Sequence, residues 1–451
     1  MTDSRAIIKD AAKFTLSGYI SGFCNFVTAI IVRKILDPFF MGIYTELTLI
    51  FQYAKYSHLG MIDALDRQIP YYNGRKEFKK VEEIKSVGIV FSFLMSLVCA
   101  LGIIIFSLLF KVHLSPLLVI GLKVIAIMVI VQSMSSFYVT LVRTHHLFGS
   151  LSKYIILVAV CDIAFKTVLG IKFGIIGILW ASVFTFTIGI VYLFKRAGLR
   201  FKLTLNLPKQ AIRSLLGIGF PLLLAGFTFT VLRSIDRIMI IALLTKEDLG
   251  YYSIAIMMYS FIFQLPNLMY TVLFPRFYEA FGSSGGDLNK LGAYLEKPTL
   301  AFAYLFPILI GLTVIILPVF VNYILPRYIE GVIPASILLF GTFFISITNM
   351  SGYLLVALKR QNILVLIAII AVIISAVLNL LFVKIFHMGI KGIALGTAIT
   401  YFLYSVFIIS YAIKYYVSGL YGKVKFFVSL YTPFLWVLLI FYLFKLRMFT
   451  K

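Results

Sequence analysis

Charged residues are scarce in this chain, and acidic residues are the scarcest of them. Charged residues make up 13% of the 451 residues, with 17 Asp and Glu against 41 Lys and Arg. Soluble domains carry about 25% charged residues, so this composition argues against a water-soluble protein. The chain has three cysteines and five histidines, and Cys24, Cys99 and Cys161 show neither a metal-binding spacing nor a disulfide framework. We therefore predict no metal site and no cofactor.

Catalytic motifs are also missing from the sequence. It contains no phosphate-binding loop, no HExxH zinc motif and no nucleophile motif. No segment between apolar blocks exceeds about 25 residues, which leaves no room for a soluble catalytic domain. These absences predict that the chain is not an enzyme.

Apolar sequence dominates instead, because hydrophobic residues make up 61% of the chain. They come in blocks of about 20 residues, the length that a helix needs to cross the hydrocarbon of a membrane. We therefore predict an all-α, polytopic membrane protein, and the first block is too long for a cleaved signal peptide. The thirteen blocks lie near 14–35, 41–62, 87–110, 116–140, 154–171, 173–194, 214–243, 250–274, 298–323, 333–357, 363–384, 390–413 and 426–446.

The sequence contains an internal repeat. With a shift of 208 positions, Gly18 matches Gly226, Ile30 matches Ile238, Gly42 matches Gly250 and Tyr44 matches Tyr252. With a shift of 215, residues 174–178 (GIIGI) match residues 389–393 (GIKGI). Repeats of this length indicate lobes rather than solenoid units.

Each copy of the repeat holds six apolar blocks, so both copies should insert in the same orientation. We predict two parallel six-helix lobes, residues 1–205 and 206–415, followed by an additional membrane helix and tail in 416–451. The equivalent residues of the two lobes should superpose without inversion.

The formal net charge of +24 fits membrane topology better than nucleic-acid binding. Loops on the side of Met1 carry about 25 Lys and Arg, against about 12 on the other side, and the positive-inside rule then places Met1 in the cytoplasm. The largest basic loops, 67–85 and 195–213, fall on the same side. We expect a multi-pass protein of the cell membrane that contacts anionic lipids and binds no nucleic acid.

Three charged residues lie close together in the seventh apolar block. Arg233, Asp236 and Arg237 have the i, i+3, i+4 spacing that places them on one face of a continuous helix. Ionisable groups at membrane depth usually face a cavity or a partner. One carboxylate cannot neutralise two guanidinium groups, so the set suits a phosphate group. An interfacial ion cluster at a helix end is the alternative.

Two further charges in the first half are separated by one helical turn. Asp162 and Lys166 could form a pair that neutralises itself, or Asp162 could bind a coupling ion. Glu46, near the outer end of the second block, is another candidate for ion coupling.

The remaining candidates for a binding cavity are single polar residues. Lys55 could line a vestibule or extend to the inner interface, and Lys123 is a weaker candidate. Asn25 occupies the repeat position of Arg233, so it should face the cavity from the first lobe if Arg233 faces it from the second.

Short motifs recur at corresponding places in the two halves. The first half contains Leu36-Asp-Pro-Phe-Phe-Met-Gly42-Ile-Tyr44 and Asp66-Arg67-Gln-Ile-Pro70-Tyr-Tyr-Asn-Gly74, and the second contains Leu249-Gly250-Tyr-Tyr252-Ser and Leu273-Phe-Pro275-Arg276-Phe. Together with Ile235-Asp236-Arg237, and over residues 10–415, the sequence resembles the polysaccharide transporter family, which includes flippases of the Wzx type. Its superfamily also holds multidrug and cation antiporters, and the resemblance implies MATE-like lobes around a central cavity.

That resemblance implies a flippase that moves a lipid-linked oligosaccharide, a polyprenyl-pyrophosphate glycan, across the cytoplasmic membrane by alternating access. The glycan would serve surface polysaccharide biosynthesis, and glycan polymerase machinery is a further candidate partner. A drug or cation antiporter of the same fold is the first alternative, although the first block has Asn25 and no carboxylate. A membrane-embedded glycan polymerase or ligase is the second alternative. Such enzymes usually carry their catalytic residues on a large exterior loop, and this sequence has no such loop.

Overall fold

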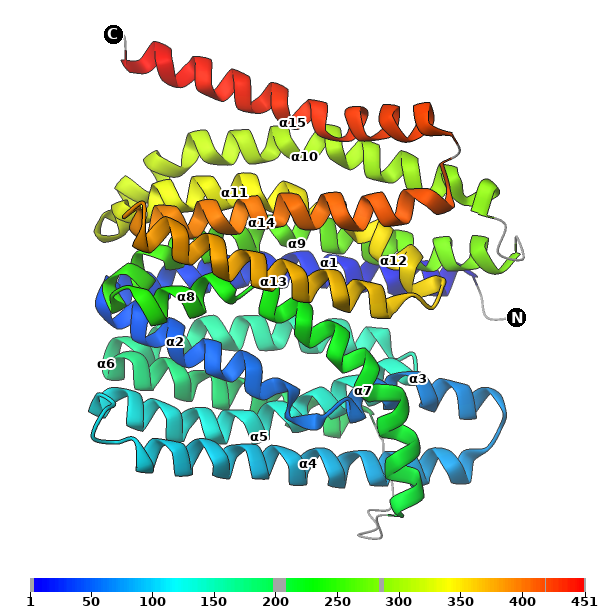
Figure 1. Cartoon of the computed structure of the whole chain (residues 1–451). Helices are drawn as coiled ribbons and strands as arrows, with labels where there is room; N and C mark the ends of the chain where they lie inside the picture. The colour runs from blue at the N-terminus through cyan, green and yellow to red at the C-terminus, as the bar shows by residue number, and fades with distance from the viewer. Residues whose placement is uncertain (1–3, 198–207, 284–287, 418, 450–451) are drawn as a thin grey trace. The chain divides into compact units, whose positions relative to one another are not determined.

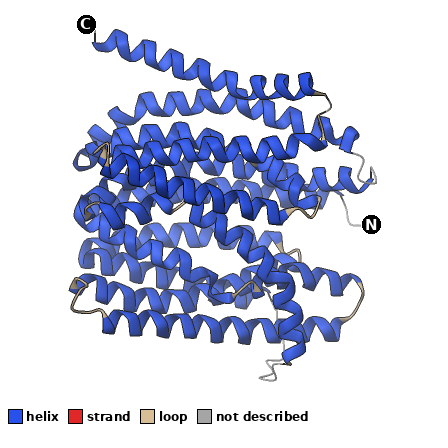
Figure 2. Cartoon of the chain, in the orientation of Figure 1, coloured by secondary structure: helices blue, strands red, loops and turns tan. Residues whose placement is uncertain are grey.

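The computed structural model describes residues 4–197, 208–283, 288–417 and 419–449. All regular elements in these ranges are helices, and the described residues contain no strand (Figure 2). The all-α prediction is therefore confirmed. The α-helices are α1 (Ser4–Ile35), α2 (Pro38–Ala54), α3 (Met61–Gly74), α4 (Phe78–Leu109), α5 (Pro116–Thr144), α6 (Phe148–Ala197), α7 (Lys209–Leu232), α8 (Ile235–Leu243), α9 (Lys246–Ser283), α10 (Leu288–Ile324), α11 (Val332–Ile347), α12 (Asn349–Ala357), α13 (Gln361–Lys384), α14 (Gly389–Ala412) and α15 (Leu420–Phe449).

Most of these helices suit a membrane. Within the described residues, ten helical segments are long and apolar enough to cross a bilayer. The last of them, Leu420–Leu439 in α15, overlaps the block predicted at 426–446. The prediction of a polytopic membrane protein is confirmed by these segments.

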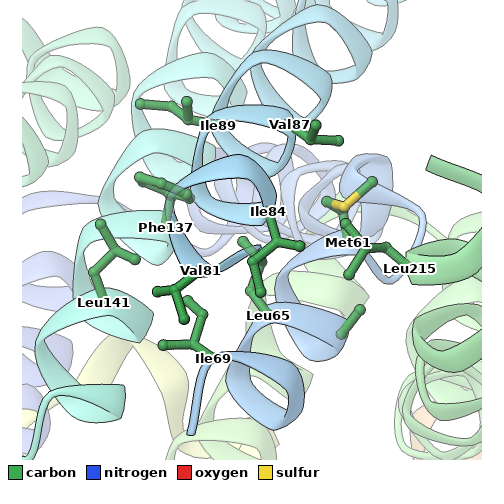
Figure 3. Packing of buried hydrophobic residues seen from close by; sticks show 11 residues of the cluster. Met61, Leu65, Ile69, Val81, Ile84, Val87, Ile89, Phe137, Leu141 and Leu215 are labelled. Carbon is green, nitrogen blue, oxygen red and sulfur yellow. The ribbon is translucent and has the colours of Figure 1, made fainter. Parts of the chain in front are cut away.

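The chain divides into two compact units, Met1–Phe227 and Thr228–Lys451. The division falls inside α7, later than the boundary at 205/206 predicted from the repeat. The first part of α7 packs into the first unit, because Leu215 joins a buried cluster with residues of α3, α4 and α5 (Figure 3). The backbones of Gly60 and Gly219 also touch, and a Cβ at either glycine would overlap the backbone of the other.

In the first unit, α6 is a helical hairpin. A straight helix of its 50 residues would be about 75 Å long, more than twice the hydrocarbon thickness. The chain reverses at Gly174, where φ is 57° and ψ is −136°. Leu151 and Leu193, from the two arms, therefore share one buried cluster. The predicted blocks 154–171 and 173–194 are these two arms.

The second predicted block, 41–62, is not one helix, and this prediction was wrong. Helix α2 begins after Asp37, whose side chain caps the helix by accepting a hydrogen bond from the backbone N–H of Phe40 (2.9 Å). A 3-10 turn, η1 (Lys55–His58), follows α2, and the left-handed φ of Leu59 and Gly60 then separates it from α3. The predicted loop 67–85 is also largely helical, since α3 continues to Gly74 and α4 begins at Phe78.

In the second unit, α11 packs against α9 and α14, and α13 packs against α14 (Figure 1). Helix α15 packs against α10, and α10 against α11. The short helix α8 lies against α13, α14 and α9. Because α8 begins in the middle of the seventh apolar block, this packing places the charges of that block among three other helices.

Candidate substrate-binding site

The seventh apolar block is interrupted at its charged residues. Helix α7 ends at Leu232, and α8 begins at Ile235. The hydroxyl of Ser234 donates to the carbonyl of Thr230 at 2.7 Å, and such a side-chain bond competes with regular helix geometry. The prediction of three charges on one face of a continuous helix was therefore wrong in its local structure.

The break nevertheless keeps the three charges in contact. The Nη2 of Arg237 donates to the backbone carbonyl of Arg233 at 3.0 Å. Its Nε lies 3.7 Å from Oδ1 of Asp236, and that oxygen also accepts the backbone N–H of Arg237 at 2.7 Å. The carboxylate thus pairs with Arg237 rather than with Arg233.

A buried tyrosine fixes the other oxygen of the carboxylate. The hydroxyl of Tyr252, on α9, donates to Oδ2 of Asp236 at 2.9 Å. Asp236 is 3% exposed and Tyr252 is fully buried, so this hydrogen bond is formed away from water. A buried carboxylate is stable only when such partners compensate for its lost hydration. Tyr252 therefore orients Asp236 from a neighbouring helix.

Aromatic rings surround the guanidinium group of Arg233. Its carbon lies 4.5 Å from the ring centre of Phe263, 5.0 Å from that of Tyr259 and 5.8 Å from that of Phe229. Ring faces attract a cation without neutralising its charge. The buried Nε of Arg233 has no hydrogen-bond partner among the described residues. Arg233 is thus held by rings and keeps a donor for another group.

The charges of this set do not balance. Arg233 and Arg237 stay protonated at any physiological pH, and Asp236 supplies at most one negative charge. The formal sum is at least +1 in a half-buried setting. A guanidinium group binds phosphate oxygens through two parallel hydrogen bonds, so the arrangement is chemically suited to a phosphate or pyrophosphate.

The first unit contains a second ionic set on different helices. Nζ of Lys166 lies 2.8 Å from Oδ2 of Asp162, and both side chains are at most 16% exposed. Tyr44 and Lys55 are close enough to Lys166 to interact with it electrostatically. Nζ of Lys55 also lies 4.7 Å from the ring centre of Phe51. The structure therefore gathers Asp162, Lys166 and Lys55, which the sequence considered separately.

Three other candidates lie apart from these contacts. Asn25, on α1, is exposed, whereas Thr28 one turn later is buried. Lys123, on α5, is exposed on the same helical face as Ile120 and Ile127. Glu46, on α2, is half-buried and has interaction partners. No contact described here joins them to the Arg233 set or to the Asp162 pair.

Some residues of the site were missed by the sequence reasoning. Tyr252, Tyr259 and Phe263 are spaced by seven and four residues, which places them on one face of α9. That spacing was a usable signal, but aromatic residues are frequent in every apolar block. The buried basic residue Arg33, whose Nη1 donates to the carbonyl of Ala29 at 2.8 Å, was also missed.

Among the residues that the structure describes, no group of three or more His, Cys, Asp or Glu is placed to hold a metal ion. The ionic sets described above consist of arginine or lysine side chains with a carboxylate.

Solved structures with the same fold are membrane transporters. The chain matches an inward-facing multidrug resistance MATE family transporter of the MOP superfamily with a TM-score of 0.71 and 11% identity, covering 93% of this chain and 98% of that one. It also matches a MOP superfamily transporter from Pyrococcus furiosus Vc1, described as having a binding pocket of reverse polarity that suggests a different function, with a TM-score of 0.64 and 10% identity over 94% and 96% of the two chains. At these identities the similarity establishes the fold alone, which is the multi-pass, MATE-like fold of those two proteins.

The family follows from the sequence itself. The family described as "Polysaccharide biosynthesis protein" matches residues 7–281, more than half of the chain. The chain therefore belongs to the polysaccharide biosynthesis family, as the resemblance implied. Among curated proteins, no sequence matches it significantly.

Proposed function

We propose that this protein is a flippase that moves a lipid-linked oligosaccharide across the cytoplasmic membrane by alternating access, for surface polysaccharide biosynthesis. The observation that supports this most directly is the excess of positive charge at Arg233 and Arg237 in a chain of this family. The substrate would be a polyprenyl-pyrophosphate glycan. Membrane lipids surround the transporter, and a glycan polymerase is a candidate partner that would consume the translocated product.

The physical problem for such a transporter is the pyrophosphate. Its charges would cross about 30 Å of hydrocarbon, where an unpaired anion is strongly disfavoured. A guanidinium group inside the protein lowers this barrier because it replaces the hydration of the anion with paired hydrogen bonds. The hydrophobic tail of the substrate needs no such help, since it can stay in the bilayer.

The aromatic surroundings of Arg233 support a binding role over a structural ion pair. A structural arginine in an apolar setting is normally paired with a carboxylate, whereas the carboxylate here is bound to Arg237 and Tyr252. We propose Arg233 as the principal anion ligand and Arg237 as its partner.

A cation-exporting antiporter is the competing function, and one experiment separates the two. The full-length protein is reconstituted in liposomes with a fluorescently labelled polyprenyl-pyrophosphate oligosaccharide, and its exposure on each leaflet is measured by quenching. We expect translocation that the chain carrying Arg233→Ala supports at a much lower rate. Matched liposomes loaded with a cationic dye should show no protein-dependent dye movement. Dye movement without oligosaccharide translocation would reject the flippase.

A further inference from the structure

A cavity of about 530 Å³ lies in the first unit, between the start of α1's apolar stretch and the hairpin α6. It is separate from the ionic sets described above, and the proposed function does not use it. Its lining residues are Lys13, Leu16, Ser17, Ile20, Gly149, Ser150, Ser152, Lys153, Ile156 and Tyr192.

Two lysines give one part of the cavity wall a positive charge. Lys13, on α1, and Lys153, on α6, both contribute to its wall, and both are exposed. No carboxylate with a described side chain lies within ion-pair distance of either lysine. Gly149 and Ser150 belong to the first turn of α6, where the helix dipole adds positive potential. Together these groups favour the binding of an anion. They are contributed by both α1 and α6, so the positive charge does not come from the end of a single helix.

The rest of the wall is apolar and continues into the membrane-facing surface. Leu16 is 60% exposed and Ile20 is 38% exposed, although both are large apolar side chains. In the sequence, Lys13 and Lys153 directly precede the apolar blocks 14–35 and 154–171. Basic side chains at the end of a membrane-spanning block lie where headgroups meet hydrocarbon. A ligand that fits this cavity is therefore charged at one end and apolar below it.

We propose that this cavity binds the phosphate headgroup of an anionic phospholipid, with the first part of an acyl chain along Leu16 and Ile20. Lys13 and Lys153 contact the phosphate, and Ser150 and Tyr192 offer hydroxyls near it. A free phosphate would leave the apolar wall uncovered, and a zwitterionic lipid would place its own cation beside the two lysines. Charge complementarity thus selects an anionic lipid.

The test measures lipid retained by the full-length protein in detergent. The purified chain is incubated with fluorescent-tailed phosphatidylglycerol or phosphatidylcholine, and the lipid that co-elutes on size exclusion is counted. We expect preferential retention of phosphatidylglycerol, and a loss of about fivefold or more in its affinity in the variant with Lys13→Gln and Lys153→Gln. Lys13→Arg with Lys153→Arg should retain the lipid, because the charge remains.

A matched variant with Lys76→Gln and Lys79→Gln removes the same charge from the α3–α4 turn and the start of α4. It should retain phosphatidylglycerol as the native chain does. Inorganic phosphate at millimolar concentration should not displace the lipid; displacement would assign the site to a free anion. Equal retention in the Lys13/Lys153 variant and the native chain, or equal loss in the Lys76/Lys79 variant, would overturn the proposal. Elution volume and thermal unfolding show that each variant is folded.

Discussion

Gly174 and Gly389 both have a positive φ, of 57° and 54°. Gly174 joins the two arms of α6, and Gly389 is the first residue of α14, which follows the end of α13 at Lys384 by a short connection. They are the glycines paired by the repeat, 215 positions apart (389 − 174). In both copies a second glycine follows three residues later, Gly177 or Gly392, where an added Cβ would crowd the preceding helix.

This correspondence connects the sequence repeat to local geometry. A positive φ costs an L-residue about 1–3 kcal/mol, so the backbone at these two positions favours glycine. Superposition of residues 10–195 on 210–415 in the same orientation stays a prediction. An experimental structure whose halves match only after inversion would contradict it.

The first prediction concerns Gly174. Gly174→Ala should lower the free energy of unfolding by about 1–3 kcal/mol through backbone strain alone, because no neighbouring atom lies within 4 Å of the added methyl group. Gly177→Ala should cost more, since its methyl group would overlap the backbone of Leu169. Thermal unfolding in detergent measures both. The control is Gly102→Ala, whose methyl group also has free space. Gly102 lies inside α4, where alanine is more stable than glycine by about 0.5–1 kcal/mol, so this variant should not lower the free energy of unfolding.

The sequence predicted the helical class, most of the apolar blocks and the family, because each depends on composition or on short motifs that can be recognised without the three-dimensional structure. Helix breaks were harder to predict. Leu59 and Ser234 stand in apolar blocks where periodicity suggests continuity, and the conformation that interrupts the helix comes from local hydrogen bonds and neighbouring packing.

The candidate site was predicted by its charges and not by its partners. Arg233, Asp236 and Arg237 are conspicuous in an apolar block, so sequence alone could select them. The pairing of Asp236 with Tyr252 depends on the packing of α8 against α9. Charge spacing cannot show which arginine is neutralised, and the structure assigns the carboxylate to Arg237.

The second prediction tests the orienting role of Tyr252. Tyr252→Phe removes the hydroxyl bound to Asp236 and leaves a buried carboxylate oxygen without that donor. We expect a loss of about 1–3 kcal/mol in stability and reduced oligosaccharide translocation. Tyr251→Phe is the matched control, because the neighbouring tyrosine makes no contact with Asp236 described here. Equal effects in the two variants would remove Tyr252 from the site.

The third prediction separates structure from ion coupling at Asp162. With Nζ of Lys166 only 2.8 Å from the carboxylate, we expect the pair to be self-contained. Asp162→Asn or Lys166→Met alone leaves one buried charge and should destabilise the protein by about 3–5 kcal/mol. The double variant should recover both abundance and translocation. If the double variant is stable but does not translocate, then Asp162 binds a coupling ion and the self-contained pair is rejected.

The fourth prediction concerns orientation, for which we propose a cytoplasmic N-terminus. In a background with the three native cysteines replaced by serine, Lys79→Cys should resist a membrane-impermeant thiol reagent applied to intact cells. Glu247→Cys, at the start of α9, should react, because a single span separates it from the cytoplasmic side in this topology. Both residues are exposed, so accessibility within the protein is comparable. The reverse labelling pattern would place the N-terminus outside the cell and contradict the proposed topology.

The last prediction concerns Arg233 in cells. Arg233→Ala removes the guanidinium group held by Phe263 and Tyr259, and the binding of a pyrophosphate should weaken by about 1–3 kcal/mol. That is about fivefold to 160-fold in affinity. Surface polysaccharide should fall accordingly in a strain that lacks the native gene, at unchanged protein abundance. Arg233→Lys should recover only part of it, because a lysine keeps the charge but loses the paired hydrogen bonds.

The control for this experiment is Arg327→Ala, which removes an exposed arginine of the same unit, at the 3-10 turn η2 (Pro326–Gly331). Its surface polysaccharide should equal that of the native chain, because an exposed side chain contributes little to stability and lies outside the aromatic setting of Arg233. Normal export by Arg233→Ala, Arg237→Ala and the double variant, each at normal abundance, would show that these residues only anchor a helix end. The anion would then bind elsewhere, and the Lys55 and Lys166 set of the first unit would be the next place to test, by Lys55→Gln.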